Sequence, residues 1–425
     1  MDRSSAIELI RGLVAIPSLS RDEARAARWL AGAMRDAGYE RAFVDDAGNA
    51  VGEIGAPDAS RTLVLLGHID TVPGDIPVRI ESSTDGDVLY GRGSVDAKGP
   101  LATFVAAAAR LDAAWTRSAD LRVVVVGAVE EEAATSKGAR FIAARFDGHR
   151  EPVPDACVIG EPSHWHRITL GYKGRLLMDL VARQPMAHTA GPDASVATIV
   201  VDLWNWVAAH AAAFNATRDK AFDQLSPSLR RFITATTPEM DDTVDAQIAW
   251  RLPIGADTDA LCRDLIAWAA AHIGTSVPML DESMWGRDSS MWGRASAFAE
   301  ASADRRSFSG GWSARPTVTI AGQKTTLDLS FRGREDPWRG DRQNALVRAF
   351  IVAIRGADPS VQPGFVLKTG TSDMNVVAPL WRCPIVAYGP GDSALDHTPH
   401  EHLSLDEYWR AVGVVERMLR TFAER

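Results

Sequence analysis

Hydrophobic residues recur at two different spacings along the first part of the chain. They recur at helical spacing in residues 4–16 and 22–36, which predicts two helices at the start of a domain. Short β-branched runs follow at 62–66 and 122–126, separated by a helical stretch at 99–114. This alternation of buried strands with helices predicts an α/β domain.

The pattern changes in the middle of the chain and returns near its end. Residues 167–335 contain longer strand-like and helix-like segments, which predicts an inserted α+β domain. Within it, the motif SMWGR occurs twice in residues 283–315, and a duplicated loop is favoured there over a binding module. We therefore expect the α/β domain to consist of residues 1–166 and 336–425.

Composition narrows the classes of partner and compartment. The net charge of −9 provides no basic field of the kind that nucleic acid requires. Cys157, Cys262 and Cys383 lie far apart without a CxxC spacing, so we expect core thiols in a reducing compartment. The start of the chain lacks a signal-peptide core, and apolar stretches such as 101–109 are shorter than a membrane span. We expect a cytoplasmic protein without nucleic-acid or membrane partners.

Candidate chemistry begins where the first apolar strand ends. His68 and Asp70 directly follow the run LVLL, and ligands bind at the carboxyl edge of such sheets. A neutral imidazole suits zinc, and a carboxylate on its other nitrogen fixes the tautomer. Asp96 lies in a glycine-rich turn before a helix, where its two oxygens could bridge two cations or simply cap the helix. Each signal alone is more typical of a structural residue.

Further acidic residues follow the later strands. Glu130, Glu131 and Glu132 stand directly after the run VVVVGAV. Adjacent carboxylates at a buried strand end repel one another unless cations or a proton neutralise them, whereas an exposed acidic turn also avoids the repulsion. Glu161 follows another apolar strand, and His397 lies in a turn after the last one. Together these residues form a nitrogen and oxygen donor set of the kind that paired catalytic zinc ions use.

With these residues assembled, the chain resembles the dinuclear zinc aminoacylase and carboxypeptidase superfamily, which includes acetylornithine deacetylase and succinyl-diaminopimelate desuccinylase. The resemblance covers nearly the whole chain apart from residues 283–315. The motifs look most similar to the lysine/ornithine-releasing hydrolases of the carrier-protein pathway, also described as acetyl-lysine deacetylases. They are GHIDTVPG at 67–74, YGRGSVDAKGP at 90–100, SKGAR at 136–140, GEPS at 160–163, GYKGRL at 171–176, KTGTSDMNV at 368–376 and YGPGDSALDHTP at 388–399.

The resemblance implies a metal-dependent amide hydrolase with two bound Zn²⁺ or Co²⁺ ions. It implies that His68 and Glu161 hold one ion, that Glu132 and His397 hold the other, and that Asp96 bridges them. The implied fold is an α/β catalytic domain with a central mixed sheet flanked by helices, and an inserted α+β dimerisation or lid domain.

The resemblance also implies supporting roles near the ions. Asp70 would orient His68, and Glu131 would be the general base that accepts the proton of the attacking water. The catalytic pair could instead be Glu130 and Glu131. We prefer Glu131 and Glu132, because Glu130 then takes the place of the acidic residue that precedes the pair in the family.

Four further residues are candidates for substrate contact. His188 stands where the family has a histidine that stabilises the oxyanion, often across a dimer, although a surface histidine is the alternative. Arg251 could clamp a substrate carboxylate or pair with a neighbour. Asp373 and Asn375 are further candidates in the turn GTSDMN.

The implied substrate is an amide of lysine or ornithine, linked to a carrier protein or carrying an N-acetyl group. A carrier would be acidic, and a local patch of four arginines could attract it despite the net charge of −9: Arg332, Arg334, Arg339 and Arg342. The alternatives are an acetylornithine- or succinyl-diaminopimelate-type deacylase or dipeptidase that acts on free small molecules, and a catalytically silent binding relative. The resemblance also implies a homodimer formed through the inserted domain.

Overall fold

The computed structural model describes residues 1–84, 86–188, 194–278 and 317–424. The predicted loop insertion at 283–315 lies outside the described residues. The chain divides into two compact units. Unit 1 consists of Met1–Tyr172, Trp338–Lys368 and Ser372–Arg425, and unit 2 consists of Lys173–Pro337 and Thr369–Thr371.

Unit 1 is built around a mixed sheet with, among the described residues, nine strands. They are β1 (Arg41–Val44), β2 (Ala50–Ile54), β3 (Arg61–His68), β6 (Leu121–Ala128), β7 (Ala156–Gly160), β8 (Arg167–Tyr172), β14 (Trp338–Arg339), β15 (Gly364–Lys368) and β16 (Ile385–Tyr388). Their order is β1-β2-β6-β3-β7-β16-β8-β14, and β15 pairs with β8. The neighbours β6, β3, β7 and β16 run parallel, so their carboxyl ends meet at one edge of the sheet.

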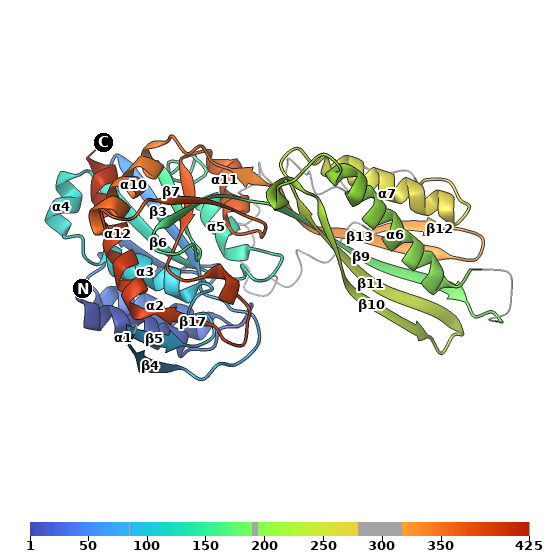
Figure 1. Ribbon diagram of the computed structural model, residues 1–425, viewed down its shortest axis with the longest axis horizontal. Coiled ribbons are helices and arrows are strands. Elements are labelled where there is room, and N and C mark those ends of the chain that lie inside the picture. Colours follow the sequence, from blue (N-terminus) through green and yellow to red (C-terminus); the bar gives the residue numbers. More distant parts are fainter. Residues whose placement is uncertain (85, 189–193, 279–316, 425) are drawn as a thin grey trace. The chain divides into compact units, whose positions relative to one another are not determined.

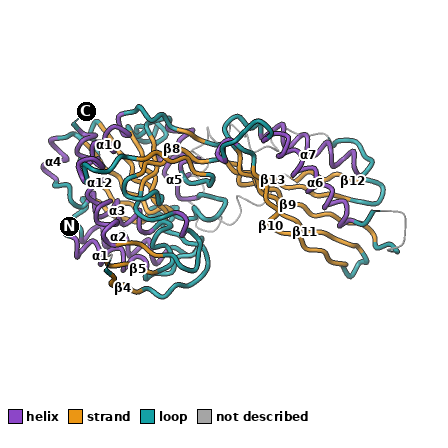
Figure 2. Tube along the Cα trace, in the orientation of Figure 1, coloured by secondary structure: helices purple, strands orange, loops and turns teal. Residues whose placement is uncertain are grey.

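Helices cover both faces of this sheet (Figures 1 and 2). They are α1 (Arg3–Val14), α2 (Ala24–Asp36), α3 (Lys98–Ala108), α4 (Ala113–Ser118), α5 (Lys137–Arg145), α10 (Ala345–Ala357), α11 (Met374–Trp381) and α12 (Leu405–Ala423). Alternate residues of β3 face two different cores: Leu63 and Leu65 pack with α1, α2, α3, α10 and α12, whereas Val64 and Leu66 pack with α5 and α11. A strand buried on both faces has a continuously apolar sequence, and the α/β prediction is confirmed.

A small antiparallel sheet connects two distant parts of unit 1. It contains β4 (Arg79–Ser83), β5 (Gly86–Tyr90) and β17 (His402–Ser404), in the order β17-β5-β4. In this sheet His402 pairs with Tyr90. The pairing brings the loop that follows β5, which contains Asp96, beside the loop between the short 3-10 helix η3 (Ser393–Leu395) and β17.

Among its described residues, unit 2 is an antiparallel sheet with two helices on one face. The strands run in the order β10 (Ser226–Thr236), β11 (Asp241–Leu252), β9 (Gly174–Pro185), β13 (Thr326–Glu335) and β12 (Thr317–Ala321). The helices are α6 (Val196–Asn215) and α7 (Thr258–His272), and the 3-10 helix η1 (Ala221–Asp223) precedes β10. Alternate residues of β9, including Met178 and Leu180, pack with both helices, which is the predicted α+β arrangement.

The division between the units differs by a few residues from the boundaries expected at 166/167 and 335/336. Strand β8 pairs with β15 and β16 in the large sheet, so the first boundary falls after Tyr172. The second falls after Pro337, because β14 also pairs with β8.

Helix α6 corrects one expectation about apolar segments. Among the described residues it is the one helix that is long and apolar enough to cross a membrane. Asp202, Asn205 and His210 divide its apolar residues into short runs, so no continuous run in the sequence approaches membrane-spanning length. Its buried residues, including Ile199, Leu203 and Val207, belong to the core of unit 2. Length and composition do not distinguish a membrane span from such a core helix.

A buried ion-pair network joins β2 to its neighbours in unit 1. Glu53 is 2% exposed, and its carboxylate accepts hydrogen bonds from three guanidinium groups. The distances are 2.6 Å to Arg145, 2.9 Å to Arg122 and 3.2 Å to Arg41. A charge in the interior is stable only when it is paired, so the buried carboxylate and the arginines stabilise one another.

We expect the replacement Glu53→Ala to lower the free energy of unfolding by about 3 kcal/mol, because Arg122 stays buried with less compensating charge. Urea unfolding followed by circular dichroism measures the change. The matched control is Glu81→Ala, since Glu81 forms an exposed pair with Arg79, and its effect should stay within about 0.5 kcal/mol. Equal effects of the two substitutions would contradict the argument.

Candidate metal centre

The predicted histidines and carboxylates of unit 1 leave the sheet at the edge where its parallel strands end. His68 is the last residue of β3, and Glu131 and Glu132 follow β6. Glu161 follows β7, and His397 lies on the loop after β16. Hydrogen bonding between parallel strands therefore places the loops that carry these residues side by side.

His68 is held in one orientation by its own loop. It is 2% exposed, and its Nδ1 lies 2.9 Å from the main-chain oxygen of Asp70. A main-chain oxygen can only accept, so Nδ1 carries a hydrogen and Nε2 points at Asp96, 3.1 Å from Oδ1. Burial lowers the pKa of His68, but its contacts with Asp70 and Asp96 outweigh burial and raise this pKa well above its usual value.

Asp96 faces both histidines with one carboxylate. Its Oδ1 lies 3.1 Å from Nε2 of His68, and its Oδ2 lies 3.0 Å from Nε2 of His397. The same nitrogen of His397 is 3.0 Å from Oε1 of Glu132. One ligand atom each from His68, Asp96 and Glu132 lie within 4.8 Å of one another, which is close enough to hold a cation.

Glu131 and Glu161 add two more carboxyl groups to this cluster. Burial, and then the charge of Asp96, raise the pKa of Glu161 to about 8. Burial also raises the pKa of Glu131 well above its usual value, with His68 opposing the shift and Glu161 adding to it. Both shifts disfavour the charged carboxylates, and bound cations would compensate that charge. The donor set therefore fits divalent cations.

The carboxylate of Asp70 holds the loop that carries the two glutamates. Asp70 is fully buried, and its Oδ1 and Oδ2 accept from the main-chain N–H groups of Glu131 at 3.1 Å and Glu132 at 3.0 Å. Its Oδ1 is 3.5 Å from Nδ1 of His68, farther than the main-chain oxygen that orients this ring. Asp70 thus links two loops of the cluster.

Glu130 points away from the histidines. Its Oε2 accepts from the hydroxyl of Thr135 at 2.7 Å and lies 3.7 Å from Nε of Arg21. Its Oε1 lies 3.9 Å from Nζ of Lys137. Glu132, in contrast, reaches His397. This geometry supports the register in which Glu131 and Glu132 are the pair.

The four candidate substrate residues are distributed over both units. His188 and Arg251 belong to unit 2, where both are exposed and Arg251 donates to the hydroxyl of Thr371. Asp373 and Asn375 belong to unit 1 and are 2% exposed. The charge of Asp373 raises the pKa of both Glu131 and Glu161, so Asp373 lies near the cluster.

Two residues beside the cluster were not singled out from the sequence. The carboxyl of Asp396 has a pKa raised to about 8, mainly by burial and then by the charge of Asp96. Among the described residues, Oδ1 of Asp396 and the buried hydroxyl of Tyr172 have no hydrogen-bond partner. The sequence could have indicated them, because Asp396 and Tyr172 lie inside two motifs that carry the family resemblance, YGPGDSALDHTP and GYKGRL.

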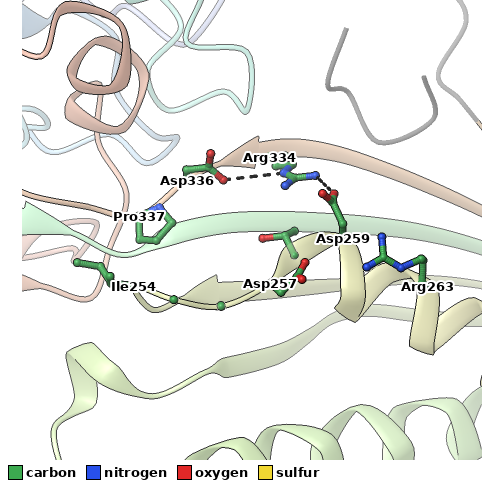
Figure 3. A pocket seen from close by; sticks show the side chains of 10 residues that line it. Ile254, Asp257, Asp259, Arg263, Arg334, Asp336 and Pro337 are labelled. Carbon is green, nitrogen blue, oxygen red and sulfur yellow. Dashed lines mark hydrogen bonds and ion pairs between the residues drawn. The ribbon is translucent and has the colours of Figure 1, made fainter. Parts of the chain in front are cut away.

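A separate hollow lies in unit 2. It has a volume of about 420 Å³ and is lined by residues 254–259 together with Arg263, Arg334, Asp336 and Pro337. Figure 3 shows Arg334 between Asp259 and Asp336, with which it forms ion pairs. No candidate catalytic residue lines this hollow.

The arginine patch predicted from the sequence is wrong for two of its four members. Arg334 pairs with Asp259, and Arg332 pairs with Asp179 at 2.5 Å. The charges of both arginines are therefore compensated within unit 2. For Arg332, antiparallel pairing of β9 with β13 brings Asp179 close to its guanidinium group. Arg339 and Arg342, both in unit 1, are exposed.

Comparison with known proteins agrees with this chemistry. The sequence model of the family described as "Peptidase family M20/M25/M40" matches residues 64–421. A "[LysW]-lysine hydrolase" of Deinococcus radiodurans is 41% identical, covering 98% of this chain and 97% of the relative. A "putative [LysW]-lysine/[LysW]-ornithine hydrolase" of Thermococcus kodakarensis is 32% identical, covering 96% and 90%.

A similar fold occurs in a solved structure, the M20 family metallo-carboxypeptidase Sso-CP2 from Sulfolobus solfataricus. The TM-score is 0.69 at 16% sequence identity, and the alignment covers 100% of both chains. The family match and the full-length relatives extend over both units and over every residue of the candidate centre. The chain therefore belongs to peptidase family M20/M25/M40 and is a hydrolase of that family.

Proposed function

We propose that this chain is a dinuclear metal hydrolase that releases lysine or ornithine from a LysW-linked precursor in amino-acid biosynthesis. The observation that carries the proposal is the carboxylate of Asp96, which directs one oxygen to His68 and the other to His397. A bridging carboxylate between two cations needs this arrangement. The names of the full-length relatives support the choice of substrate.

The proposed ligands divide between two cations. His68 and Glu161 would hold the first, Glu132 and His397 the second, and Asp96 both. Imidazole and carboxylate donors suit Zn²⁺ and also Co²⁺. When bound, the two ions would supply electrophilic polarisation of the amide carbonyl and a lowered pKa for water.

Glu131 is the proposed general base. It would accept the proton of the attacking water and deliver it to the leaving amine, so that one group acts first as base and then as acid. The buried surroundings that raise the pKa of Glu131 favour the form that holds the transferred proton. Asp70 would keep Glu131 in place through the bond to its main-chain N–H.

The remaining candidates would bind the substrate. His188 would stabilise the oxyanion, and Arg251 would bind a carboxylate of the amino acid. Asp373, close to Glu131 and Glu161, would face the amino group of the substrate, and Asn375 would contact it through its amide.

We further propose a cytoplasmic homodimer that assembles through unit 2, with biosynthesis of lysine or arginine as its setting. The three cysteines support a reducing compartment, because all three are free thiols and Cys157 and Cys262 are buried.

Substrate preference tests the proposal directly. We expect kcat/KM for LysW-linked lysine or ornithine to exceed that for the matching N-acetyl amino acid by at least about tenfold, because a carrier adds contacts that an acetyl group lacks. Release of the free amino acid, measured by chromatography, gives both values. A preference for the N-acetyl compounds would instead identify a small-molecule deacylase.

Metal removal and return test the dinuclear centre. Protein stripped with a chelator should take up two equivalents of Zn²⁺ or Co²⁺ per chain, and its melting temperature should rise because the cations bind only the folded state. Asp96→Asn should weaken the uptake of both ions. Mass spectrometry of metal content and calorimetric titration measure this, and uptake of one ion by the unaltered protein would contradict the arrangement.

A matched pair of substitutions tests the register of the glutamates. Glu131→Gln should lower kcat by roughly 10²–10⁴-fold while both cations stay bound, because the amide cannot accept the proton. Glu130→Gln should leave kcat almost unchanged, since Glu130 faces Thr135 and Arg21. Turnover on LysW-linked lysine, with metal content measured in parallel, decides between them. The opposite result would move the catalytic pair to Glu130 and Glu131.

A further inference from the structure

Glu401 is a fully buried carboxylate that lies outside the proposed ligand set. It directly precedes β17 and follows His397 by four residues. Since the charged form of a buried carboxylate needs partners, its contacts indicate its role.

The first oxygen of Glu401 binds the main chain of the loop that carries Asp96. Oε1 accepts from the N–H of Val95 at 2.9 Å and from the N–H of Asp96 itself at 3.0 Å. Hydrogen bonds to a charged acceptor are roughly twice as strong as neutral ones. The backbone position of Asp96 therefore depends on Glu401.

The second oxygen of Glu401 binds Arg92, which joins two further loops. Oε2 lies 2.7 Å from Nη1 of Arg92, and the same nitrogen donates to the main-chain oxygen of Thr398 at 3.1 Å. Nε of Arg92 donates to the main-chain oxygen of Gly74 at 3.0 Å. One guanidinium thus links the loop after His68 to the loop after His397.

We propose that Glu401 and Arg92 form a positioning pair that sets the spacing between Asp96 and His397 for cation binding. The inference rests on the proposed dinuclear function. The pair holds Asp96 through its own N–H and holds the His397 loop through Thr398, one residue away. The 3.0 Å separation of Asp96 Oδ2 and His397 Nε2 is the distance that it controls.

A comparison within the cluster supports this role. Asp70 holds the loop of Glu131 and Glu132 by the same means, a buried carboxylate that accepts two consecutive main-chain N–H groups. Each loop that carries a bridging or catalytic carboxylate is therefore fixed by a carboxylate that is not itself a proposed ligand. Partners that orient metal ligands typically contribute 10–100-fold to metal affinity.

Calorimetric titration of the chelator-stripped full chain with Co²⁺ tests the pair. In Glu401→Gln and in Arg92→Gln we expect the weaker of the two cation sites to lose roughly 10–100-fold in affinity. The visible absorption of bound Co²⁺ should change as well, since it reports the ligand geometry. The double variant should lose no more than either single one, because the two residues act as a unit.

Arg92→Lys provides a conservative rescue. It keeps the positive charge beside Glu401 but has one nitrogen in place of the two with which Arg92 binds Gly74, Thr398 and Glu401, so its Co²⁺ affinity should lie between that of the unaltered protein and that of Arg92→Gln. If Glu401→Gln fails to fold, the comparison of Arg92→Lys with Arg92→Gln still tests the inference.

Glu53→Gln is the matched control. Glu53 is also buried and bound to arginines, but it contacts no loop of the cluster. It should lower the melting temperature and leave both Co²⁺ affinities within about twofold of the unaltered protein.

The results separate this inference from the proposed function. Unchanged Co²⁺ affinity and absorption in folded Glu401→Gln and Arg92→Gln would overturn the positioning role, and so would failure of the unaltered protein to bind a second cation. Two-site binding without hydrolysis of any lysine or ornithine amide would instead overturn the proposed function, while the titrations still decide the role of the pair.

Discussion

Repulsion among closely spaced carboxyl groups is the physical constraint on which the structure around the candidate metal centre depends. Four carboxyl groups converge where the parallel strands end: Asp96, Glu131, Glu132 and Glu161. Besides burial, the charge of Asp96 raises the pKa of Glu161, and the charges of Glu161 and Glu132 raise the pKa of Glu131. Against the effect of burial, His397 and His68 lower the pKa of Asp96. Such a cluster is stable only when protons or cations compensate the charge. The sheet supplies the rigid frame that keeps these groups together, because β3, β6 and β7 are buried on both faces.

Main-chain hydrogen bonds to carboxylates hold this cluster in place. Loops leave the sheet with unpaired N–H groups, and buried acceptors satisfy them. Asp70 accepts from the glutamate loop, Glu401 from the Asp96 loop, and Glu23 from the N–H of Glu130 at 3.1 Å. The same chemical group therefore serves in two ways at this edge of the sheet, as a candidate ligand and as an anchor for the loops that carry ligands.

Much of the fold was predictable, because runs of apolar residues identify the segments that are buried in the core. The apolar runs that became β3 and β6 identified the central strands, and the polar residues directly after them identified the edge that carries the candidate site. No apolar segment of membrane-spanning length was expected, because Asp202, Asn205 and His210 interrupt the apolar runs of helix α6. The predicted arginine patch failed at Arg332 and Arg334, because the sequence does not show that Asp179 on β9 and Asp259 on α7 lie within reach of their guanidinium groups.

The sequence by itself determined the α/β class, the inserted α+β segment and the residue types at the strand ends, because these depend on local hydrophobic periodicity and on short motifs. Only the tertiary structure decided which of the consecutive glutamates faces His397, since Glu132 lies 3.0 Å from its Nε2 whereas Glu130 binds Thr135. It also decided that Glu401 meets Asp96, about 300 residues earlier in the chain, because antiparallel pairing of β17 with β5 brings their loops together. Contacts between distant segments depend on how the whole chain packs, and no local pattern contains that information.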